Sequence, residues 1–322
     1  MSSVADPTLP QVFNRSTALQ RGFTPKQVRL RLESGTWRRL RRGAYCRAEV
    51  WAEADDRLRH VLEARALVLV TPTPAWLSHA SAAALLHLPT PRAPGPLCLT
   101  HLPPARLRLL DGVVVHAATL AQQDRWEVQD LPVTSTRRTV GDCLRHLPPA
   151  DGLAVLDAAL AGAQSLRADV SALLAGCARW PGARQAAALL ELGDGRRESP
   201  LESWSFWEMH SRGLPLPQPQ VLVHDHNGLF VGRVDFWWEA FNVVGEADGR
   251  VKYDVGADGD ARRAQQALVA EKEREDRLRA TGVTVVRWGA RDLERPGVWA
   301  AWLRARLLEA QGQQFRGLAL SS

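Results

Sequence analysis

The sequence is poor in several features that mark particular protein classes. Its four cysteines are scattered without metal-site spacing, so we expect free thiols in a reducing compartment. The first 30 residues lack the apolar core of a signal peptide, and no apolar run is long enough to span a membrane. The nine histidines form no zinc pattern, and no nucleotide-binding glycine loop is present. These absences predict a cytoplasmic protein without a membrane partner.

Lysine is also scarce, because only three of the 41 basic residues are lysines: Lys26, Lys252 and Lys272. The other global values are ordinary for a globular protein, with 322 residues, 45% apolar and 24% charged. This length predicts two or three domains. We expect a multidomain α/β (α+β) protein with domains at 1–46, 47–197 and 198–322.

Positive charge is concentrated at the amino end. Residues 1–46 hold nine basic and two acidic residues, a balance of +7, whereas the whole chain carries only +6. The remainder of the chain is therefore close to −1. A localised positive field of this kind is typical of binding to double-stranded DNA. The alternative is that the arginines form a solvated face and reflect genomic base composition.

The local pattern of the amino end predicts a winged helix-turn-helix. Thr24-Pro25-Lys26-Gln27 is a capping box with Pro at the first helical position, and the helix should end near 33. A short helix at 17–20 precedes it, and an arginine-rich β-hairpin at 36–46 follows. The residues expected to bind DNA are Lys26, Arg29, Arg31, Arg38, Arg39, Arg41 and Arg42, with Arg29 and Arg31 nearest the groove and the hairpin arginines on phosphates.

The run Gly35-Thr36-Trp37-Arg38-Arg39-Leu40-Arg41-Arg42-Gly43-Ala44-Tyr45 resembles the amino-terminal domain of AbiEi-type antitoxins of type IV toxin–antitoxin systems. The run Ser135-Thr136-Arg137-Arg138-Thr139, followed by Asp142, is similar to one in the same proteins. The resemblance implies a winged helix, a role in transcription regulation and a cognate toxin as a partner.

The middle of the chain, 47–197, carries no recognisable chemistry. Helices are expected at 51–70, 78–86 and over much of 151–192, with short strands at 97–101 and 113–116. We expect Asp142 to pair with a neighbouring arginine. The prediction is a mainly helical connector domain, with 193–199 as the linker to the last domain.

Three acids gather on two consecutive strands predicted at 229–238 and 241–245. Asp235 lies in the first apolar run, and Glu246 and Asp248 follow the second at positions i and i+2. Alternation places Glu246 and Asp248 on one face, and a hairpin would bring Asp235 beside them. Such a cluster is typical of a Mg²⁺ (or Mn²⁺) site, because hard cations take carboxylate oxygens. An unpaired acid in an apolar strand would otherwise cost several kcal/mol.

The surrounding elements carry a second resemblance. A helix beginning at 199, strands at 220–224 and on the acidic hairpin, a helix at 260–281, a strand at 283–288 and a last helix from 291 give the order α-β-β-β-α-β. This order and the Asp…Glu-x-Asp pattern resemble divergent PD-(D/E)XK nucleases, specifically the domain-of-unknown-function family related to the very-short-patch repair endonuclease. The resemblance covers about 198–311 and implies a restriction-endonuclease-like core.

The resemblance also implies roles for individual residues. Asp235 and Glu246 would bind the metal, with Glu202 and Asp248 completing the catalytic set. Asp248 stands where the family has Lys, and the possible substitutes are Lys252, which we prefer, and Lys272. Two alternatives remain open: Glu202 as part of a Ser199 capping box, and Asp248-Gly249 as an ordinary turn.

The sequence therefore predicts a DNA-binding protein with a Mg²⁺-dependent endodeoxyribonuclease domain that hydrolyses phosphodiester bonds. The alternative is a non-enzymatic antitoxin-type regulator whose nuclease-like domain is degenerate.

Overall fold

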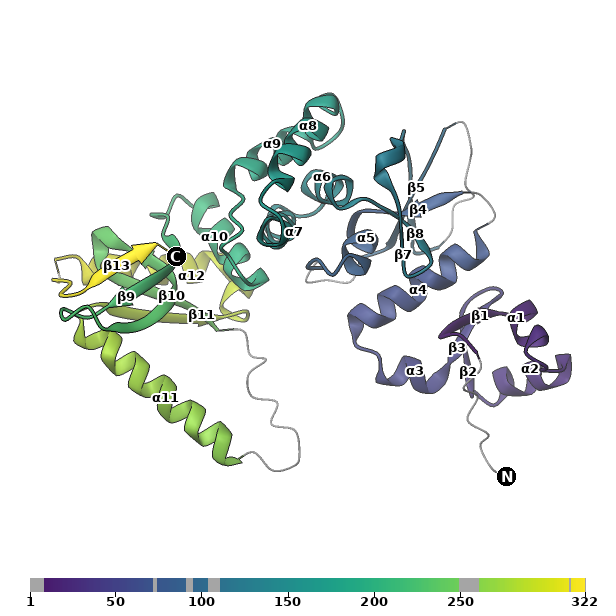
Figure 1. Cartoon of the computed structure of the whole chain (residues 1–322), viewed down its shortest axis with the longest axis horizontal. Coiled ribbons are helices and arrows are strands. Elements are labelled where there is room, and N and C mark those ends of the chain that lie inside the picture. Colours follow the sequence, from purple (N-terminus) through teal and green to yellow (C-terminus); the bar gives the residue numbers. More distant parts are fainter. Residues whose placement is uncertain are drawn as a thin grey trace. The chain divides into compact units, whose positions relative to one another are not determined.

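The computed structural model describes residues 9–71, 74–90, 95–103, 111–248, 261–312 and 314–321 (Figure 1). These residues form twelve α-helices and three β-sheets, which confirms the mixed α/β class. The chain divides into two compact units: unit 1 is Met1–Leu147 with Ser165–Glu191, and unit 2 is Pro148–Gln164 with Leu192–Ser322. Within the described ranges, we find no helix with the length and apolarity needed to cross a membrane.

Unit 1 begins with a small sheet and two helices. The elements are β1 (Val12–Asn14), α1 (Arg15–Gln20), α2 (Pro25–Glu33), β2 (Trp37–Arg41) and β3 (Ala44–Arg47), with strand order β1-β3-β2. The expected capping box is present, because the Thr24 N–H donates to Gln27 Oε1 at 2.8 Å and the Gln27 N–H donates to Thr24 Oγ1 at 3.3 Å. Phe13, Val28 and Trp37 are buried between the sheet and the helices. The short strand β1 was not expected.

The rest of unit 1 contains a five-stranded sheet that the sequence only partly indicated. Its order is β6-β5-β4-β8-β7. The expected strands are β5 (Leu97–His101) and β6 (Val113–Ala117), and the additional ones are β4 (Ala75–Leu77), β7 (Arg125–Val128) and β8 (Leu131–Thr134). The helices are α3 (Ala48–Glu53), α4 (Asp56–Val70), α5 (His79–Leu85), α6 (Thr136–His146), α8 (Leu166–Gly176) and α9 (Ala183–Leu192). The interpretation as a mainly helical connector therefore missed a sheet, because three- and four-residue strands give little alternation to detect.

The boundary expected at 197/198 also differs from the structure. Helix α7 (Pro149–Gly162) belongs to unit 2 and packs against α10 (Pro200–Ser211). Arg197 donates to Asp157 at 2.6 Å, and both side chains are almost completely buried. Ser203 Oγ also donates to Asp157, at 2.7 Å. The segment 193–199 is thus fixed by a buried ion pair rather than acting as a linker.

Unit 2 is a five-stranded sheet covered on both faces. After α10 come β9 (Gln218–His224), β10 (Phe230–Trp238), β11 (Val243–Asp248), α11 (Ala261–Ala280), β12 (Thr284–Gly289), α12 (Pro296–Ala310) and β13 (Leu318–Ser321). The strand order is β12-β11-β10-β9-β13, and only the β11–β12 pair is parallel. The α-β-β-β-α-β order expected from the sequence is present, followed by α12 and the unexpected β13.

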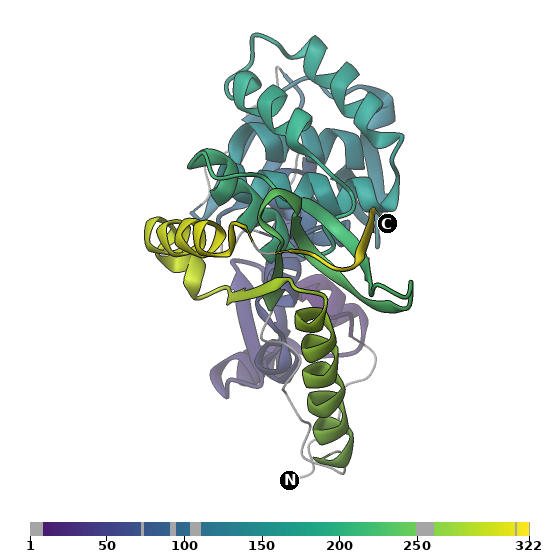
Figure 2. The same ribbon diagram turned by 90° about the vertical axis from the view of Figure 1, so that its left-hand side faces the viewer.

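Two apolar clusters hold the helices on this sheet. Phe236 and Trp288 pack with residues of α10 and α12, whereas Trp237 and Val244 pack with Leu278 of α11. Figure 2 shows α11 and α12 on different sides of the strands. The acid-bearing hairpin β10–β11 is therefore at the centre of unit 2, between two layers of helices.

Candidate active site and nucleic-acid surface

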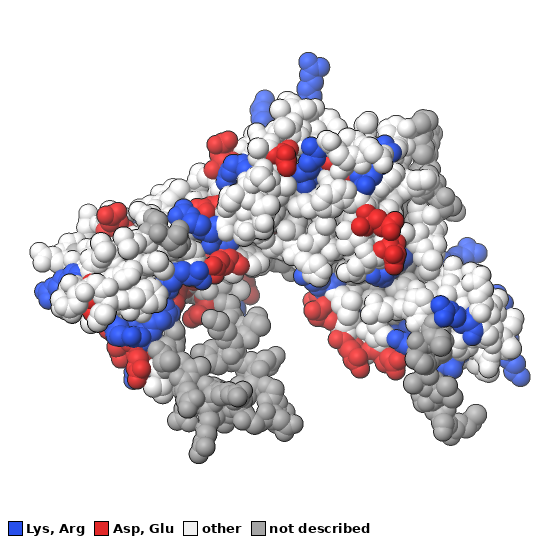
Figure 3. Space-filling view, viewed as in Figure 1, with Lys and Arg blue, Asp and Glu red and all other residues white. Residues whose placement is uncertain are grey.

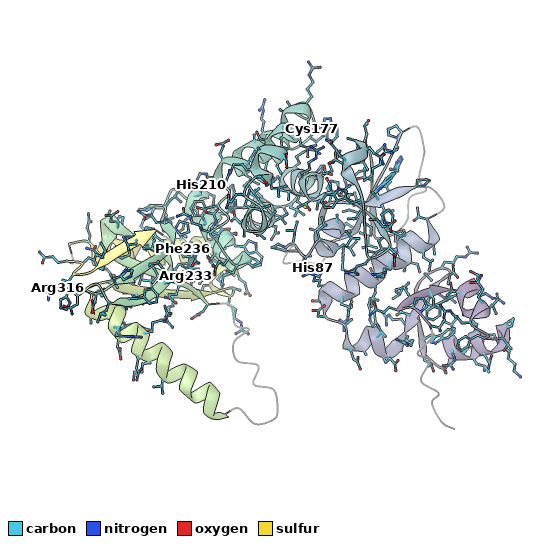
Figure 4. All side chains as sticks on the ribbon, in the orientation of Figure 1. His87, Cys177, His210, Arg233, Phe236 and Arg316 are labelled. Carbon is cyan, nitrogen blue, oxygen red and sulfur yellow. The ribbon has the colours of Figure 1, made fainter. Side chains whose placement is uncertain are left out.

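The β10–β11 hairpin brings two of the predicted acids together. Phe236 pairs with Gly245 in the antiparallel register, so the next positions outward are Asp235 and Glu246. Asp235 Oδ2 accepts a hydrogen bond from the Ala247 N–H at 2.9 Å. Figure 4 labels Arg233 and Phe236, which lie on β10 on either side of Asp235. The predicted pairing of the two strands is confirmed.

Asp248 lies farther out. Its side chain is 66% exposed at the end of β11, and its nearest described cation is Arg287 Nη1 on β12, at 3.9 Å. Asp248 shares a strand face with Glu246, as alternation requires, but it is not part of the buried group. The structure thus separates it from Asp235 and Glu246.

Glu202 joins the buried acids through a residue that the sequence did not indicate. Gln220 on β9 donates through Nε2 to Glu202 Oε2 at 2.8 Å and to Asp235 Oδ1 at 3.3 Å. Glu202 also accepts from Ser199 Oγ at 2.7 Å, and its own N–H donates to Ser199 Oγ at 3.2 Å. Glu202 is therefore both a capping residue and a neighbour of the acid pair, so the two readings of this residue coexist.

Burial changes the protonation of the acid pair. Burial, with a smaller contribution from the nearby Glu202 charge, raises the pKa of Asp235 from 3.8 to about 6, against the opposing effect of the Ala247 N–H. Burial likewise raises the pKa of Glu246, which the neighbouring Arg274 opposes. Two adjacent carboxyl groups that resist ionisation gain most from a nearby cation.

Arg274 supplies one such positive charge. From α11 its guanidinium donates to Glu246 at 3.1 and 2.8 Å and to the Arg233 carbonyl at 3.3 Å. Lys272 is exposed and lies two positions earlier on the same helix, so it cannot share the face that Arg274 turns to the acids. Lys272 as the substitute for the family lysine is therefore not supported. Lys252 lies outside the described residues.

The donor set of this group suits a hard cation. Asp235, Glu246 and Glu202 offer carboxylate oxygens, and the buried Oε1 of Gln220 has no hydrogen-bond partner among the described residues. However, among the described residues these three carboxylates are not gathered closely enough to form a three-ligand metal site. Mg²⁺ sites commonly use only one or two carboxylates with water and substrate phosphate. The adjacent pair Asp235 and Glu246 is thus the part of the group that could hold such an ion.

The predicted DNA-binding residues of unit 1 divide into two kinds. Lys26 and Arg29 on α2, and Arg39 and Arg42 on the β2–β3 hairpin, are exposed. Arg29 also forms a surface ion pair with Glu33 at 3.5 Å. On the face drawn in Figure 3, Lys and Arg form several separate groups, some of them beside Asp and Glu. These four side chains are therefore accessible to solvent.

The remaining three arginines also contact the protein itself. Arg31 lies over Phe23 and Trp37, 5.1 and 5.6 Å from their ring centroids. Arg38 is exposed but lies 4.5 Å from the Trp51 ring, and Arg41 donates to the Asp111 carbonyl at 3.4 Å. Arg31 and Arg41 are half-buried, so part of their role is structural.

Comparison with known proteins gives relatives without a described activity. No protein-family model matches the chain. Two sequences of Mycobacterium tuberculosis, the uncharacterized proteins MT2308 and Rv2248, are each 30% identical over 210 residues, which is 65% of this chain and 73% of theirs. The chain belongs to the family of these two proteins. A crystal structure of the RV2827C protein, also from Mycobacterium tuberculosis, is 20% identical and covers 61% of this chain and 76% of that one, with a TM-score of 0.38. A TM-score this low carries no conclusion about fold or function.

Proposed function

We propose that unit 2 is a PD-(D/E)XK-like, metal-dependent nuclease and that the amino-terminal part of unit 1 is a winged helix that binds duplex DNA. The observation that carries the nuclease proposal is the buried pair Asp235 and Glu246 on adjacent strands, with Glu202 linked to Asp235 through Gln220. The element order around this pair supports the same assignment, because it places the acids at the centre of an α-β-β-β-α-β unit.

Asp235 and Glu246 would hold Mg²⁺ or Mn²⁺. When bound there, such an ion activates water and stabilises negative charge on the scissile phosphate. Gln220 fixes the orientation of Glu202 and Asp235 through its two hydrogen bonds. The Ala247 N–H fixes the other oxygen of Asp235. Arg274 would take the part of the missing family lysine and contact the phosphate, since a guanidinium recognises phosphate oxygens in a bidentate manner.

The DNA-binding proposal is supported by a helix and a hairpin that both carry exposed basic side chains. The capping box fixes the start of α2, and the buried Trp37 anchors the β2–β3 hairpin against Phe13. Lys26, Arg29, Arg39 and Arg42 would contact phosphates, which gives affinity without sequence information.

One observation favours the alternative, a non-enzymatic regulator that uses unit 2 as a scaffold. Arg274 already neutralises Glu246 with two hydrogen bonds, so this carboxylate does not require a metal ion for its charge to be balanced. The absence of the family lysine at Asp248 points the same way.

The two functions are separated by a nuclease assay on supercoiled plasmid and linear duplex DNA, with EDTA, Mg²⁺ or Mn²⁺. The proposed nuclease should cut only with a divalent cation, and Asp235→Asn should not cut while retaining wild-type DNA affinity. If the wild-type chain cuts no DNA with any divalent cation yet still binds duplex, the regulator is the correct function.

A further inference from the structure

Unit 1 contains a group of three histidines that come from distant parts of the sequence. His79 begins α5, His116 lies on β6 and His146 ends α6. One nitrogen from each ring lies within 4.8 Å of the others. The ring centroids are separated by 3.9 Å for His79–His116, 4.7 Å for His79–His146 and 5.3 Å for His116–His146. In the described residues, no other group of three His, Cys, Asp or Glu side chains is this close.

His79 and His146 each use Nδ1 in a hydrogen bond, so the Nε2 of each ring is available to bind a metal ion. His79 Nδ1 lies 2.9 Å from Ser78 Oγ, and its buried Nε2 has no partner among the described residues. His146 Nδ1 lies 3.1 Å from the Asp142 carbonyl oxygen, which leaves its Nε2 for another contact. A histidine that binds a metal usually donates its other N–H to an oxygen in this way, which fixes the ring orientation.

The backbone of His79 has a positive φ, and this conformation orients the His79 ring toward the other two histidines. His79 has φ of +53°, in the left-handed region that residues other than glycine seldom adopt, and it is only 4% exposed. Such strain persists only where the surrounding structure imposes it, and it is concentrated at functional sites. Here it places a buried imidazole next to His116 and His146.

The buried charges nearest the cluster pair with one another and leave a net charge of +1 beside it. Asp142 accepts from Arg138 at 2.7 Å and from Arg145 at 3.0 Å, and all three side chains are buried. Burial, together with the neighbouring histidines and arginines, lowers the pKa of His79 to about 2 and that of His116 to about 4. Both rings are therefore neutral at neutral pH, which is the form that binds metals.

We propose that His79, His116 and His146 form a Zn²⁺ site, with a solvent molecule as the fourth ligand. Neutral imidazole nitrogens suit zinc, and three protein ligands with one open position are typical of zinc sites that are not purely structural. Zn–N distances of about 2.0–2.1 Å in a tetrahedron require the nitrogens to be about 3.3 Å apart. Binding therefore draws the three ring nitrogens, which lie within 4.8 Å of one another, closer together and turns His116 out of its stack on His79. His146 is exposed and His116 half-buried, so both can move and the site is open to solvent.

The test is Zn²⁺ binding to the metal-stripped full chain, measured by competition with a chromogenic chelator, with Co²⁺ as a spectroscopic probe of nitrogen coordination. The wild-type chain should bind one Zn²⁺ at this site. His146→Ala should weaken this binding by more than about 100-fold, beyond the roughly 10–100-fold effect of losing an outer hydrogen-bond partner. Because His146 is exposed, this variant should keep the wild-type melting temperature in the absence of metal. Ser78→Ala should give the smaller, outer-partner effect.

His87→Ala is the matched control, since His87 is exposed, lies in unit 1 and is outside the cluster (Figure 4). It should bind Zn²⁺ as the wild type does. The double variant Asp235→Asn, Glu246→Gln should also bind one Zn²⁺, which excludes the acids of unit 2 as the source. Failure of the wild type to bind, or an unchanged affinity in His146→Ala, would overturn the proposal and leave the cluster as stacked neutral rings.

Discussion

The acid group of unit 2 and the histidine cluster of unit 1 are both sets of potential metal ligands, but they are built in opposite ways. Asp235 and Glu246 come from one hairpin, carry charge and are accompanied by Arg274. His79, His116 and His146 come from three separate elements, are neutral where buried and have no acidic side chain among the three ligands. The first set suits a hard cation with phosphate, and the second suits zinc.

The difference shows how a folded protein offsets the cost of burying each kind of ligand group. Buried carboxylates repel each other and lose hydration, so they need a cation or protons. Buried imidazoles can remain neutral at little cost. An acid site is therefore linked to nearby basic residues, as Glu246 is to Arg274, whereas a histidine site depends mainly on how the fold positions the rings.

The largest expected effect comes from removing the charge of the acid pair. Asp235→Asn or Glu246→Gln should reduce metal-dependent cleavage by at least about 10³-fold, since a metal ion contributes several kcal/mol and each 1.36 kcal/mol is tenfold in rate. Asp248→Asn is the control and should lose far less, because its side chain is 66% exposed. Initial rates of plasmid cleavage measure both. Equal losses in all three variants would mean that Asp248 belongs to the same site.

A second prediction asks whether the two sets of ligands lie in independent units. Arg197→Ala leaves Asp157 buried and unpaired, and should destabilise unit 2 by about 3–5 kcal/mol. Arg196→Ala, in the adjacent and more exposed pair with Asp194, should cost less than about 1 kcal/mol. Urea unfolding measures both. Zn²⁺ binding by the histidine cluster should survive Arg197→Ala. If this variant lost both Zn²⁺ binding and metal-dependent DNA cleavage, the two units would fold as one.

The two sets should also respond to pH with opposite signs. Because the pKa of Asp235 rises from 3.8 to about 6, the folded protein binds more protons than the unfolded one between these values, so this group's contribution to stability falls as pH rises from about 4 to 6. The full effect is at most about 3 kcal/mol. Relative to the wild type, Asp235→Asn should thus gain stability as pH rises, and Mg²⁺ should reduce that gain.

The histidines reverse this trend. The pKa of His116 falls from 6.5 to about 4, so the unfolded protein binds more protons in that interval and stability falls as pH drops from 6.5 to 4. His116→Asn should therefore gain stability over the wild type at low pH. The measurement is the melting temperature of Asp235→Asn and of His116→Asn, each relative to the wild type, at pH 4.5 and 6.5. If these two differences changed with pH in the same direction, the prediction would be contradicted.

The smallest expected effect concerns the basic surface. Arg39→Ala with Arg42→Ala should reduce the slope of log K against log salt by about 1.8, at about 0.9 for each lost phosphate contact. Arg31→Ala with Arg41→Ala should change this slope less and lower stability more, because both side chains are half-buried against the protein. Fluorescence anisotropy at several salt concentrations gives the slopes. An unchanged slope in the first pair would remove the hairpin from the DNA-binding surface.

Local interactions account for what the sequence predicted well. The start of α2 follows from Thr24 and Gln27, which bond within one turn, and the alignment of Asp235 with Glu246 follows from the period of two in paired strands. The turn between β10 and β11 was less predictable. Three residues form a 3-10 turn and Asn242 adopts φ of +50°, so β11 begins two residues later than expected.

Tertiary structure alone decided the rest, because it depended on residues that are far apart in the chain. Gln220 and Arg274 reach the acids from β9 and α11, and nothing in their local sequence marks them. Asp157 joins α7 to the rest of unit 2 through Arg197, which lies 40 residues later in the chain. The histidines of the cluster are separated by 30 or more positions, so no spacing could reveal them. The sequence by itself determined α2, the β2–β3 and β10–β11 hairpins and the acid pair, since short-range hydrogen bonds and alternation fix these. The partners of those acids and the entire histidine cluster arose only when packing brought distant elements together.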